Sequence, residues 1–245
     1  MVAIAVGQKR FEGIEAIFFD KDGTLADSGK RLRELSQKRA RLLDAQFPGI
    51  GEPLLLAFGV QGSVLDPAGL MAVGSVYENE IAAAAYIAET GRGWLEARAA
   101  TQAAFAEADR QFAQEPDPLF PGSLEVLQRL AQTELKLGIL SAATMTNVQE
   151  FVAQQNLGAY FQVSIGVEPG GLDKPDPKFF QFACQELGVD PGKTLMVGDA
   201  AGDIQMAQAA GAAGTIAISW GATAPPSSLA AADLFISELS ALSIG

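Results

Sequence analysis

Between residues 123 and 219 the sequence alternates between helical and strand patterns, and no other feature restricts the possible folds as much. Apolar residues at helical spacing predict helices, and short apolar runs predict strands. The predicted elements are helix 123–132, strand 135–140, helix 145–155, strand 163–167, helix 177–187, strand 194–197, helix 203–210 and strand 215–219. Helices and strands that take turns along a chain form right-handed crossovers and a parallel sheet. We therefore predict an α/β fold with a Rossmann-like, doubly wound parallel sheet.

One further strand is predicted at residues 14–19, where almost every residue is apolar. Such a run is typical of a strand that is covered on both faces in a parallel sheet. The chain from 28 to 116 shows helical spacing instead, with Gly91 and Gly93 as a break between two Ala-rich helices, and a proline-rich linker follows at 116–121. We expect a core domain of residues 1–27 and 117–245, interrupted by an all-helical domain of residues 28–116.

Two aspartates, Asp20 and Asp22, follow the first predicted strand in the sequence Asp-Lys-Asp-Gly-Thr-Leu. Ligands of open α/β sheets bind at the carboxyl ends of the strands, so these carboxylates are candidates for a functional site. The single lysine between them cannot neutralise both, which favours a bound cation or a raised pKa on one of them. The alternative is that both are turn formers, because Asp and Gly are common in turns. An EF-hand loop is excluded because its later acidic ligands are missing.

Polar residues also follow later strands of the predicted sheet. Ser141 follows the strand at 135–140, and its hydroxyl and the amides of the next helix could bind a phosphate oxygen. Asp199 lies just after the strand at 194–197, and Asp203 lies one helical turn further on. Both carboxylates could therefore bind one ion. Lys174 lies in a stiff loop before a proline, where its ammonium could neutralise a phosphate and an aspartate together.

Composition excludes several classes of function. Lys and Arg number 17 and Asp and Glu 29, and the net charge of -12 argues against nucleic acid or an anionic membrane as a partner. The absence of histidine excludes Ser-His-Asp and Cys-His catalysis and His-ligated zinc. The one cysteine, Cys184, lies in an apolar helical stretch, which predicts a core thiol rather than a nucleophile.

The amino terminus and the lengths of the apolar stretches indicate where in the cell the protein is expected. The short apolar amino terminus precedes Lys9 and Arg10, which is the reverse of a secretory signal. No stretch reaches the length of about 18 to 20 uninterrupted apolar residues that a membrane-spanning helix needs. We therefore expect a cytoplasmic protein.

The order of these motifs resembles that of the haloacid dehalogenase superfamily, and most closely its phosphoglycolate phosphatase group. The Asp-Lys-Asp-Gly-Thr-Leu sequence at Asp20 is similar to the first motif of the family, and Ser141 to the second. Lys174 in Lys-Pro-Asp-Pro is similar to the third motif, and Asp199 with Asp203 to the fourth. The resemblance extends over nearly the whole chain, and it implies that the helical insertion is a cap domain.

The resemblance implies a phosphatase mechanism that uses a covalent intermediate. Asp20 would be the nucleophile that forms an aspartyl-phosphate, and Asp22 the general acid and then the general base. Asp22 also favours phosphate transfer over dehalogenation, because displacement of a halide from carbon leaves no alkoxide to protonate. A phosphomutase of the same fold and a non-enzymatic binder are the alternatives, although a binder has no physical need for four crowded carboxylates.

The same resemblance implies a bound cofactor, Mg²⁺. Asp20, the backbone carbonyl of Asp22, and Asp199 would hold the ion, with Asp203 acting through water. Lys174 would offset the repulsion between the nucleophile and the phosphate. The resemblance also implies that Ser141 and Thr24 bind or orient the phosphoryl group that is transferred.

Three residues need separate comment. Ala142 stands where the family often has Asn, which leaves the orientation of the substrate open. Lys21 is predicted to face the surface. Arg92 is a candidate contact for a substrate carboxylate or sugar, but we favour a solvated arginine in a Gly-flanked turn. The expected partner is a small phosphorylated metabolite such as phosphoglycolate, and the sequence leaves the substrate and the choice between monomer and homodimer open.

Overall fold

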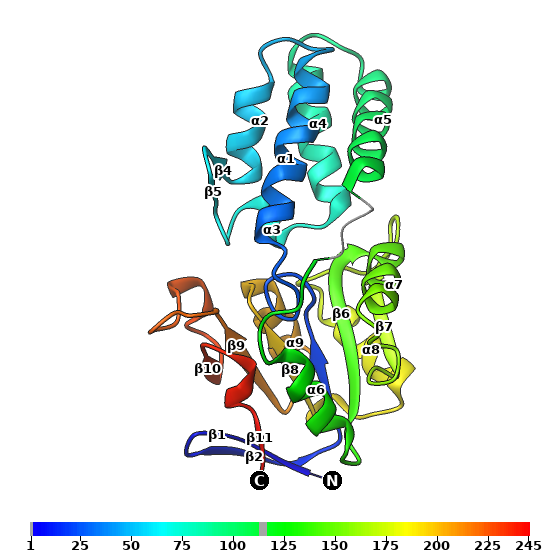
Figure 1. Ribbon diagram of the computed structural model, residues 1–245. Coiled ribbons are helices and arrows are strands. Elements are labelled where there is room, and N and C mark those ends of the chain that lie inside the picture. Colours follow the sequence, from blue (N-terminus) through cyan, green and yellow to red (C-terminus); the bar gives the residue numbers. More distant parts are fainter. Residues whose placement is uncertain (1, 113–116) are drawn as a thin grey trace. The chain divides into compact units, whose positions relative to one another are not determined.

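The computed structural model describes residues 2–112 and 117–245, and they divide into two compact units (Figure 1). The first unit comprises Met1–Asp27 and Pro118–Gly245, and the second comprises Ser28–Asp117. Our predicted boundary after residue 116, with Pro116 at the start of the linker, lies outside the described residues. Within the described ranges, none of the helices combines the length and apolar character required to cross a membrane.

A six-stranded parallel sheet forms the centre of the first unit, in the order β10-β9-β8-β3-β6-β7. Its strands are β3 (Ala16–Phe19), β6 (Lys136–Thr144), β7 (Val163–Val167), β8 (Thr194–Gly198), β9 (Gly214–Ile218) and β10 (Leu234–Ile236). The strand nearest the amino terminus lies in the middle of this sheet, between two strands from the carboxyl-terminal half. The predicted α/β fold with a doubly wound parallel sheet is therefore confirmed.

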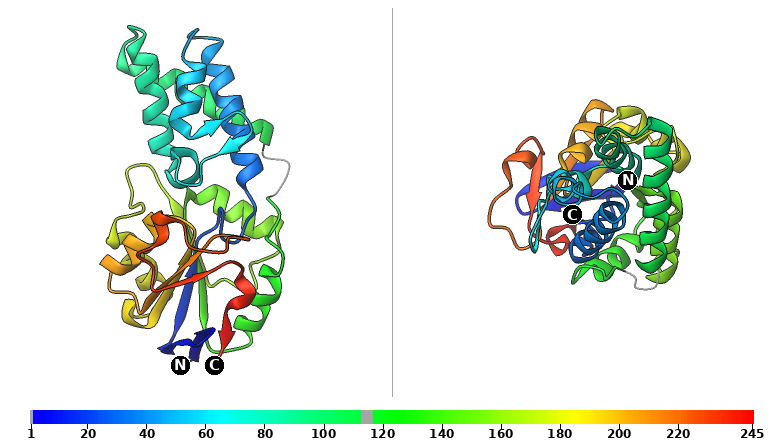
Figure 2. Two further views of the ribbon diagram at one scale, coloured as in Figure 1. Left: turned by 90° about the vertical axis from the view of Figure 1, so that its left-hand side faces the viewer. Right: turned by 90° about the horizontal axis from the view of Figure 1, so that it is seen from above.

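Helices cover both faces of the sheet (Figure 2). They are α6 (Ser123–Ala131), α7 (Met145–Gln154), α8 (Pro177–Leu187) and α9 (Ala201–Ala209), with short 3-10 turns at Pro191–Lys193, Ser227–Leu229 and Leu239–Ala241. Ile17 and Phe19 of β3 pack in the core that includes α6 and α7. Phe18, between them, points to the other face, where its ring meets Phe180 of α8 edge-on at 5.6 Å. Because both faces are covered, every residue of β3 is buried.

Four short strands of the first unit were not predicted. One is β10, and the others are β1 (Val2–Val6), β2 (Lys9–Ile14) and β11 (Ser243–Ile244), which form a separate antiparallel sheet in the order β11-β1-β2. This sheet brings the two ends of the chain together (Figure 1). The apolar run at 14–19 is consequently divided, because Ile14 ends β2 and β3 begins at Ala16.

The second unit is helical except for one small ribbon. Its helices are α1 (Gly29–Asp44), α2 (Gly51–Phe58), α3 (Leu70–Val73), α4 (Val76–Glu89) and α5 (Trp94–Phe112), and the ribbon consists of β4 (Val60–Gln61) and β5 (Val64–Leu65). Gly59 and Gly62, both with positive φ, flank β4 and permit the reversals of the chain there. The unit has its own apolar core, in which the rings of Phe58 and Phe105 meet edge-on.

The Ala-rich segments of the second unit supply much of that core. Ala83 and Ala84 of α4 and Ala104 and Ala108 of α5 are all buried in it, as expected for two helices that pack closely. Arg92 lies in the turn between these helices, with its side chain half exposed and paired with Glu96 at 3.3 Å. This position agrees with the solvated arginine that we favoured.

Cys184 lies on α8 and is buried in the first unit. Burial raises the pKa of its thiol to about 12, so the reactive thiolate is scarce at neutral pH. We expect the native protein to resist iodoacetamide at pH 8 and the urea-unfolded protein to take up one equivalent, as measured by intact mass. Rapid alkylation of the native protein would contradict the burial of this thiol.

Candidate active site

The register of the sheet places Asp20 at the carboxyl edge, between two neighbouring strands. Phe19 of β3 is aligned with Ile139 of β6 on one side and with Val197 of β8 on the other. The amide of Asp20 continues this ladder by donating to the carbonyl of Val197 at 2.9 Å. Asp20 and Asp199 therefore directly follow neighbouring parallel strands, and Ser141 lies near the same edge on the adjacent strand β6, which continues to Thr144. This is the edge where such sheets bind ligands.

The segment after Asp20 folds into a tight turn. The amides of Leu25 and Ala26 both donate to the carbonyl of Lys21, and the amide of Gly23 donates to the carbonyl of Ala26. Gly23 has a φ of +77°, and a Cβ atom there would lie 2.0 Å from Oδ2 of Asp199. The turn therefore requires glycine both for its backbone conformation and for the close approach of the Asp199 carboxylate.

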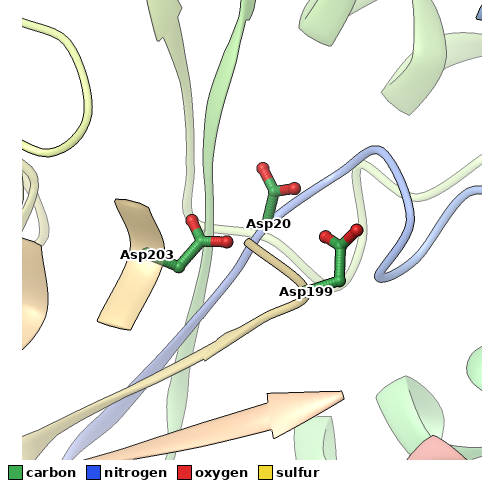
Figure 3. A group of neighbouring side chains, drawn as sticks. All are labelled: Asp20, Asp199 and Asp203. Atoms are coloured by element: carbon green, nitrogen blue, oxygen red, sulfur yellow. The ribbon is translucent and has the colours of Figure 1, made fainter. Parts of the chain in front are cut away.

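Three carboxylates converge at this edge: Asp20 after β3, Asp199 after β8 and Asp203 on α9 (Figure 3). Each can offer one oxygen such that these oxygens all lie within 4.8 Å of one another. Burial, together with the charges of Asp20 and Asp203, raises the pKa of Asp199 well above its ordinary value. Burial also raises the pKa of Asp203 to about 6, against the lowering influence of Lys174. Carboxylate oxygens in such a group are the donors that hard divalent cations such as Mg²⁺ prefer.

The backbone around Asp203 is adapted to its carboxylate. Asp203 lies in the first turn of α9, and its Oδ2 accepts a hydrogen bond from the amide of Ala200 at 3.1 Å. An acidic side chain is favourable at this end of a helix, where unpaired amides and the helix dipole meet it. A Cβ atom on Gly198 would lie 2.3 Å from the same Oδ2, so the strand end needs glycine to leave room for this side chain.

Lys174 is the cation of the cluster. Its Nζ lies 2.6 Å from Oδ1 of Asp20 and 2.5 Å from Oδ1 of Asp203, and its side chain is only 6% exposed. Burial alone would lower the pKa of Lys174, but the charges of Asp20 and Asp203 outweigh burial and raise it. The lysine therefore stays protonated, and one positive charge faces three carboxylates.

Asp22 lies in the same turn, but its carboxylate pairs with Lys21 at 2.5 Å. The prediction that Lys21 faces the surface is wrong, because the residue is only 2% exposed. Its Nζ also lies 5.5 Å from the ring centroid of Phe151 on α7. The turn directs this side chain beneath α7, where the ion pair and the aromatic ring compensate for the loss of water.

Besides Lys174, the predicted phosphate-binding residues are Thr24 and Ser141, and both are buried in the first unit. Thr24 donates its hydroxyl to Oδ1 of Asp199 at 3.0 Å, so it contacts the carboxylate cluster directly. Ser141 lies within β6, and its Oγ accepts a hydrogen bond from the amide of Ala143 at 3.2 Å.

Trp220 is a residue near this site that we did not predict. It follows β9, and its indole N–H donates to the carbonyl of Thr24 at 3.2 Å. Its ring stacks on that of Phe120, with the ring centroids 4.3 Å apart and an interplanar angle of 11°. The available signal was its position directly after the predicted parallel strand at 215–219, at the edge that also carries Asp20 and Asp199.

With this geometry established, comparison with known proteins identifies the family. The family model described as haloacid dehalogenase-like hydrolase matches residues 14–211, a range that includes every site residue predicted from the sequence. The chain belongs to this family. The resemblance predicted from the four motifs is therefore confirmed.

Named relatives and solved structures show which members of this family the chain resembles. The chain is 29% identical over 201 residues to the phosphoglycolate phosphatase of Aliivibrio fischeri, covering 82% of each chain. Among solved structures, it matches a predicted phosphoglycolate phosphatase from Haemophilus somnus 129pt with a TM-score of 0.72 and 19% identity, covering 96% of this chain and 97% of the other. It also matches a β-phosphoglucomutase from Clostridium difficile with a TM-score of 0.65 and 19% identity, covering 92% of each. The chain is thus an enzyme of the hydrolase family whose named sequence relatives are phosphatases, in agreement with the predicted enzyme class.

Proposed function

We propose that this hydrolase is a Mg²⁺-dependent phosphatase that acts on a small phosphorylated metabolite through an aspartyl-phosphate. The observation that carries the proposal is the close group of Asp20, Asp199 and Asp203, two of which are buried, with Lys174 bound to those two. The sequence relatives named phosphoglycolate phosphatase support phosphoglycolate or a closely similar phosphoester as the substrate.

The residues of the site fit a Mg²⁺ ion. Three carboxylates lie close together, with Asp20 and Asp203 buried and Asp199 half-buried, and Lys174 supplies one positive charge to them. Three carboxylates beside one ammonium leave an excess of negative charge, which a second cation or the uptake of protons would neutralise. The raised pKa values of Asp199 and Asp203 reflect this excess. Asp20, Asp199 and Asp203 would hold the ion together with the backbone carbonyl of Asp22. When bound, Mg²⁺ would neutralise negative charge on the phosphoryl oxygens.

The chemistry follows from the placement of Asp20 and Asp22 in one turn. A carboxylate oxygen of Asp20 attacks phosphorus, and the bond from phosphorus to the ester oxygen breaks. Asp22, which enters this step protonated and released from its pairing with Lys21, gives its proton to the leaving alkoxide. Asp22, now ionised, takes a proton from a water molecule, whose oxygen attacks the aspartyl-phosphate. Inorganic phosphate leaves, and both side chains return to their starting states.

The other residues of the site would prepare the substrate for this reaction. The ammonium of Lys174 lies against Asp20, where its charge reduces the repulsion between the nucleophile and an anionic phosphate. Ser141 would bind a phosphoryl oxygen from β6, the strand beside the one that Asp20 follows. Thr24 would orient the phosphoryl group as well. Because its hydroxyl donates to Asp199, Thr24 links the residues that would bind phosphate to those that would bind the metal.

A phosphomutase remains the alternative, because the β-phosphoglucomutase from Clostridium difficile shares this fold. A mutase would return the phosphoryl group of Asp20 to a sugar phosphate instead of to water. It would need a bisphosphate activator and would release little inorganic phosphate, so a phosphate-release assay with and without such an activator separates the two functions.

Removal of the metal gives a direct test of the proposed cofactor. We expect excess EDTA to abolish phosphate release, because the carboxylate cluster would lose the cation that the reaction requires. Added Mg²⁺ should restore the activity of the same sample, whereas added Na⁺ at equal ionic strength should not. Activity that persists in EDTA after dialysis would exclude a metal role.

A further inference from the structure

We infer that Trp220 is a positioning residue, which fixes the metal ligand Asp199 by holding the turn that contacts it. This inference rests on the proposed function, since it concerns the metal-binding role of Asp199. It begins from two contacts of Thr24: the carbonyl accepts from the Trp220 indole at 3.2 Å, and the hydroxyl donates to Asp199 at 3.0 Å. Trp220 and Asp199 are therefore joined through one buried residue.

The backbone of the turn contacts the Asp199 carboxylate closely. The hydroxyl of Thr24 binds Oδ1, and the Cα of Gly23 lies so near Oδ2 that no Cβ would fit between them. A displacement of a few tenths of an ångström at residues 23 and 24 would therefore either break the hydrogen bond or press on the carboxylate. The position of this short stretch thus determines where Asp199 presents its oxygens.

Trp220 is itself held firmly enough to fix that stretch. Its ring stacks on Phe120, and the Phe120 amide donates to the carbonyl of Leu25 at 2.9 Å, next to the Thr24 carbonyl that Trp220 binds. The residues on either side of Trp220 are anchored as well, since the amides of Ser219 and Gly221 donate to carbonyls of residues 236 and 237. The stacked pair of Phe120 and Trp220 therefore holds two successive carbonyls of the turn.

The indole N–H has a role that packing alone does not require. A phenylalanine at position 220 could still stack on Phe120, but it could not donate to the Thr24 carbonyl. The substitution Trp220→Phe therefore separates the hydrogen bond from most of the aromatic contact. The chain offers a matched control, because its only other tryptophan, Trp94, lies exposed at the start of α5 in the second unit.

The test compares W220F and W94F with the wild-type protein by isothermal titration with Mg²⁺ and by steady-state phosphate release. We expect W220F to bind Mg²⁺ about 3- to 10-fold more weakly, the scale of one lost hydrogen bond, and to lose kcat with less change in KM. W94F should bind Mg²⁺ as the wild-type protein does. Phe120→Leu, which keeps the indole N–H but removes the stacked ring, serves as a second variant if W220F does not fold.

The outcomes separate this inference from the proposed function. Unchanged Mg²⁺ affinity in W220F, alongside normal binding by the wild-type protein, would overturn the positioning role and leave the phosphatase intact. A lower melting temperature without weaker metal binding would have the same meaning, because it indicates a structural role alone. Failure of the wild-type protein to bind Mg²⁺ would instead overturn the proposed function, and the positioning role with it.

Discussion

Asp20→Asn should reduce phosphate release by roughly 10⁴-fold or more, the scale of loss expected when a covalent nucleophile is removed. The amide keeps the volume of the carboxylate but cannot attack phosphorus to form the aspartyl-phosphate. The fold should persist, because Lys174 keeps its second partner, Asp203, at 2.5 Å. The measurement is the rate of phosphate release at saturating Mg²⁺, together with the melting temperature of each protein.

Asp22→Asn is the informative comparison for this variant. It removes the proposed acid and base but leaves the nucleophile. Its rate of phosphate release should therefore fall about 10²- to 10⁴-fold, while Asp20 can still become phosphorylated. Intact-mass analysis after brief mixing with substrate should show a phosphorylated Asp22→Asn protein and an unmodified Asp20→Asn protein. Substantial turnover by Asp20→Asn at an unchanged melting temperature would contradict the nucleophile assignment.

Lys174→Met should have the largest effect on stability among the site variants in metal-free buffer. Lys174 contacts Asp20 and Asp203 in a site where its side chain is 6% exposed and that of Asp203 is fully buried. Removal of one partner from a buried ion pair leaves uncompensated charge, so the expected loss of unfolding free energy is about 3 kcal/mol. The measurement is urea-induced unfolding in EDTA, followed by circular dichroism.

Lys178→Met is the matched control, because this lysine lies exposed in the first turn of the neighbouring helix α8. Its free energy of unfolding should differ from that of the wild-type protein by no more than about 0.5 kcal/mol, as is usual for surface substitutions. Millimolar Mg²⁺ should restore part of the stability lost by Lys174→Met, since a bound cation replaces the missing positive charge. Equal stability of the two variants in EDTA would show that the carboxylates do not depend on Lys174.

The core fold was predictable because its signals are local and agree with one another. Helix α8 illustrates this, since Pro177 follows the capping residue Asp176 and Gly188 ends the helix in the left-handed conformation. The predicted bounds of α8 and of β7 match the observed ones. Strands β10 and β11 escaped prediction because each is three residues long or shorter, so that pairing with other strands rather than local sequence defines them.

The site was predictable where a polar residue follows a strand, because parallel strands bring their carboxyl ends to one edge. This reasoning indicated Asp20 and Asp199, and it also indicated Ser141, although β6 continues past Ser141 to Thr144. It failed for Lys21, because the burial of a charged side chain depends on the path of the turn and on Phe151, which is remote in sequence. It also passed over Trp220, since an aromatic side chain after a strand does not by itself indicate a hydrogen bond to a turn almost 200 residues away.

The measurement that tests the central claim most directly is phosphate release, with Mg²⁺ present, from a panel of phosphorylated metabolites. The panel should include phosphoglycolate and several hexose phosphates, and Asp20→Asn serves as the control. The site geometry predicts Mg²⁺-dependent release by the wild-type protein that the control lacks, with phosphoglycolate or a similar small phosphoester as the best substrate. No release across the panel, or equal release by both proteins, would contradict the assignment of this site as a phosphatase centre.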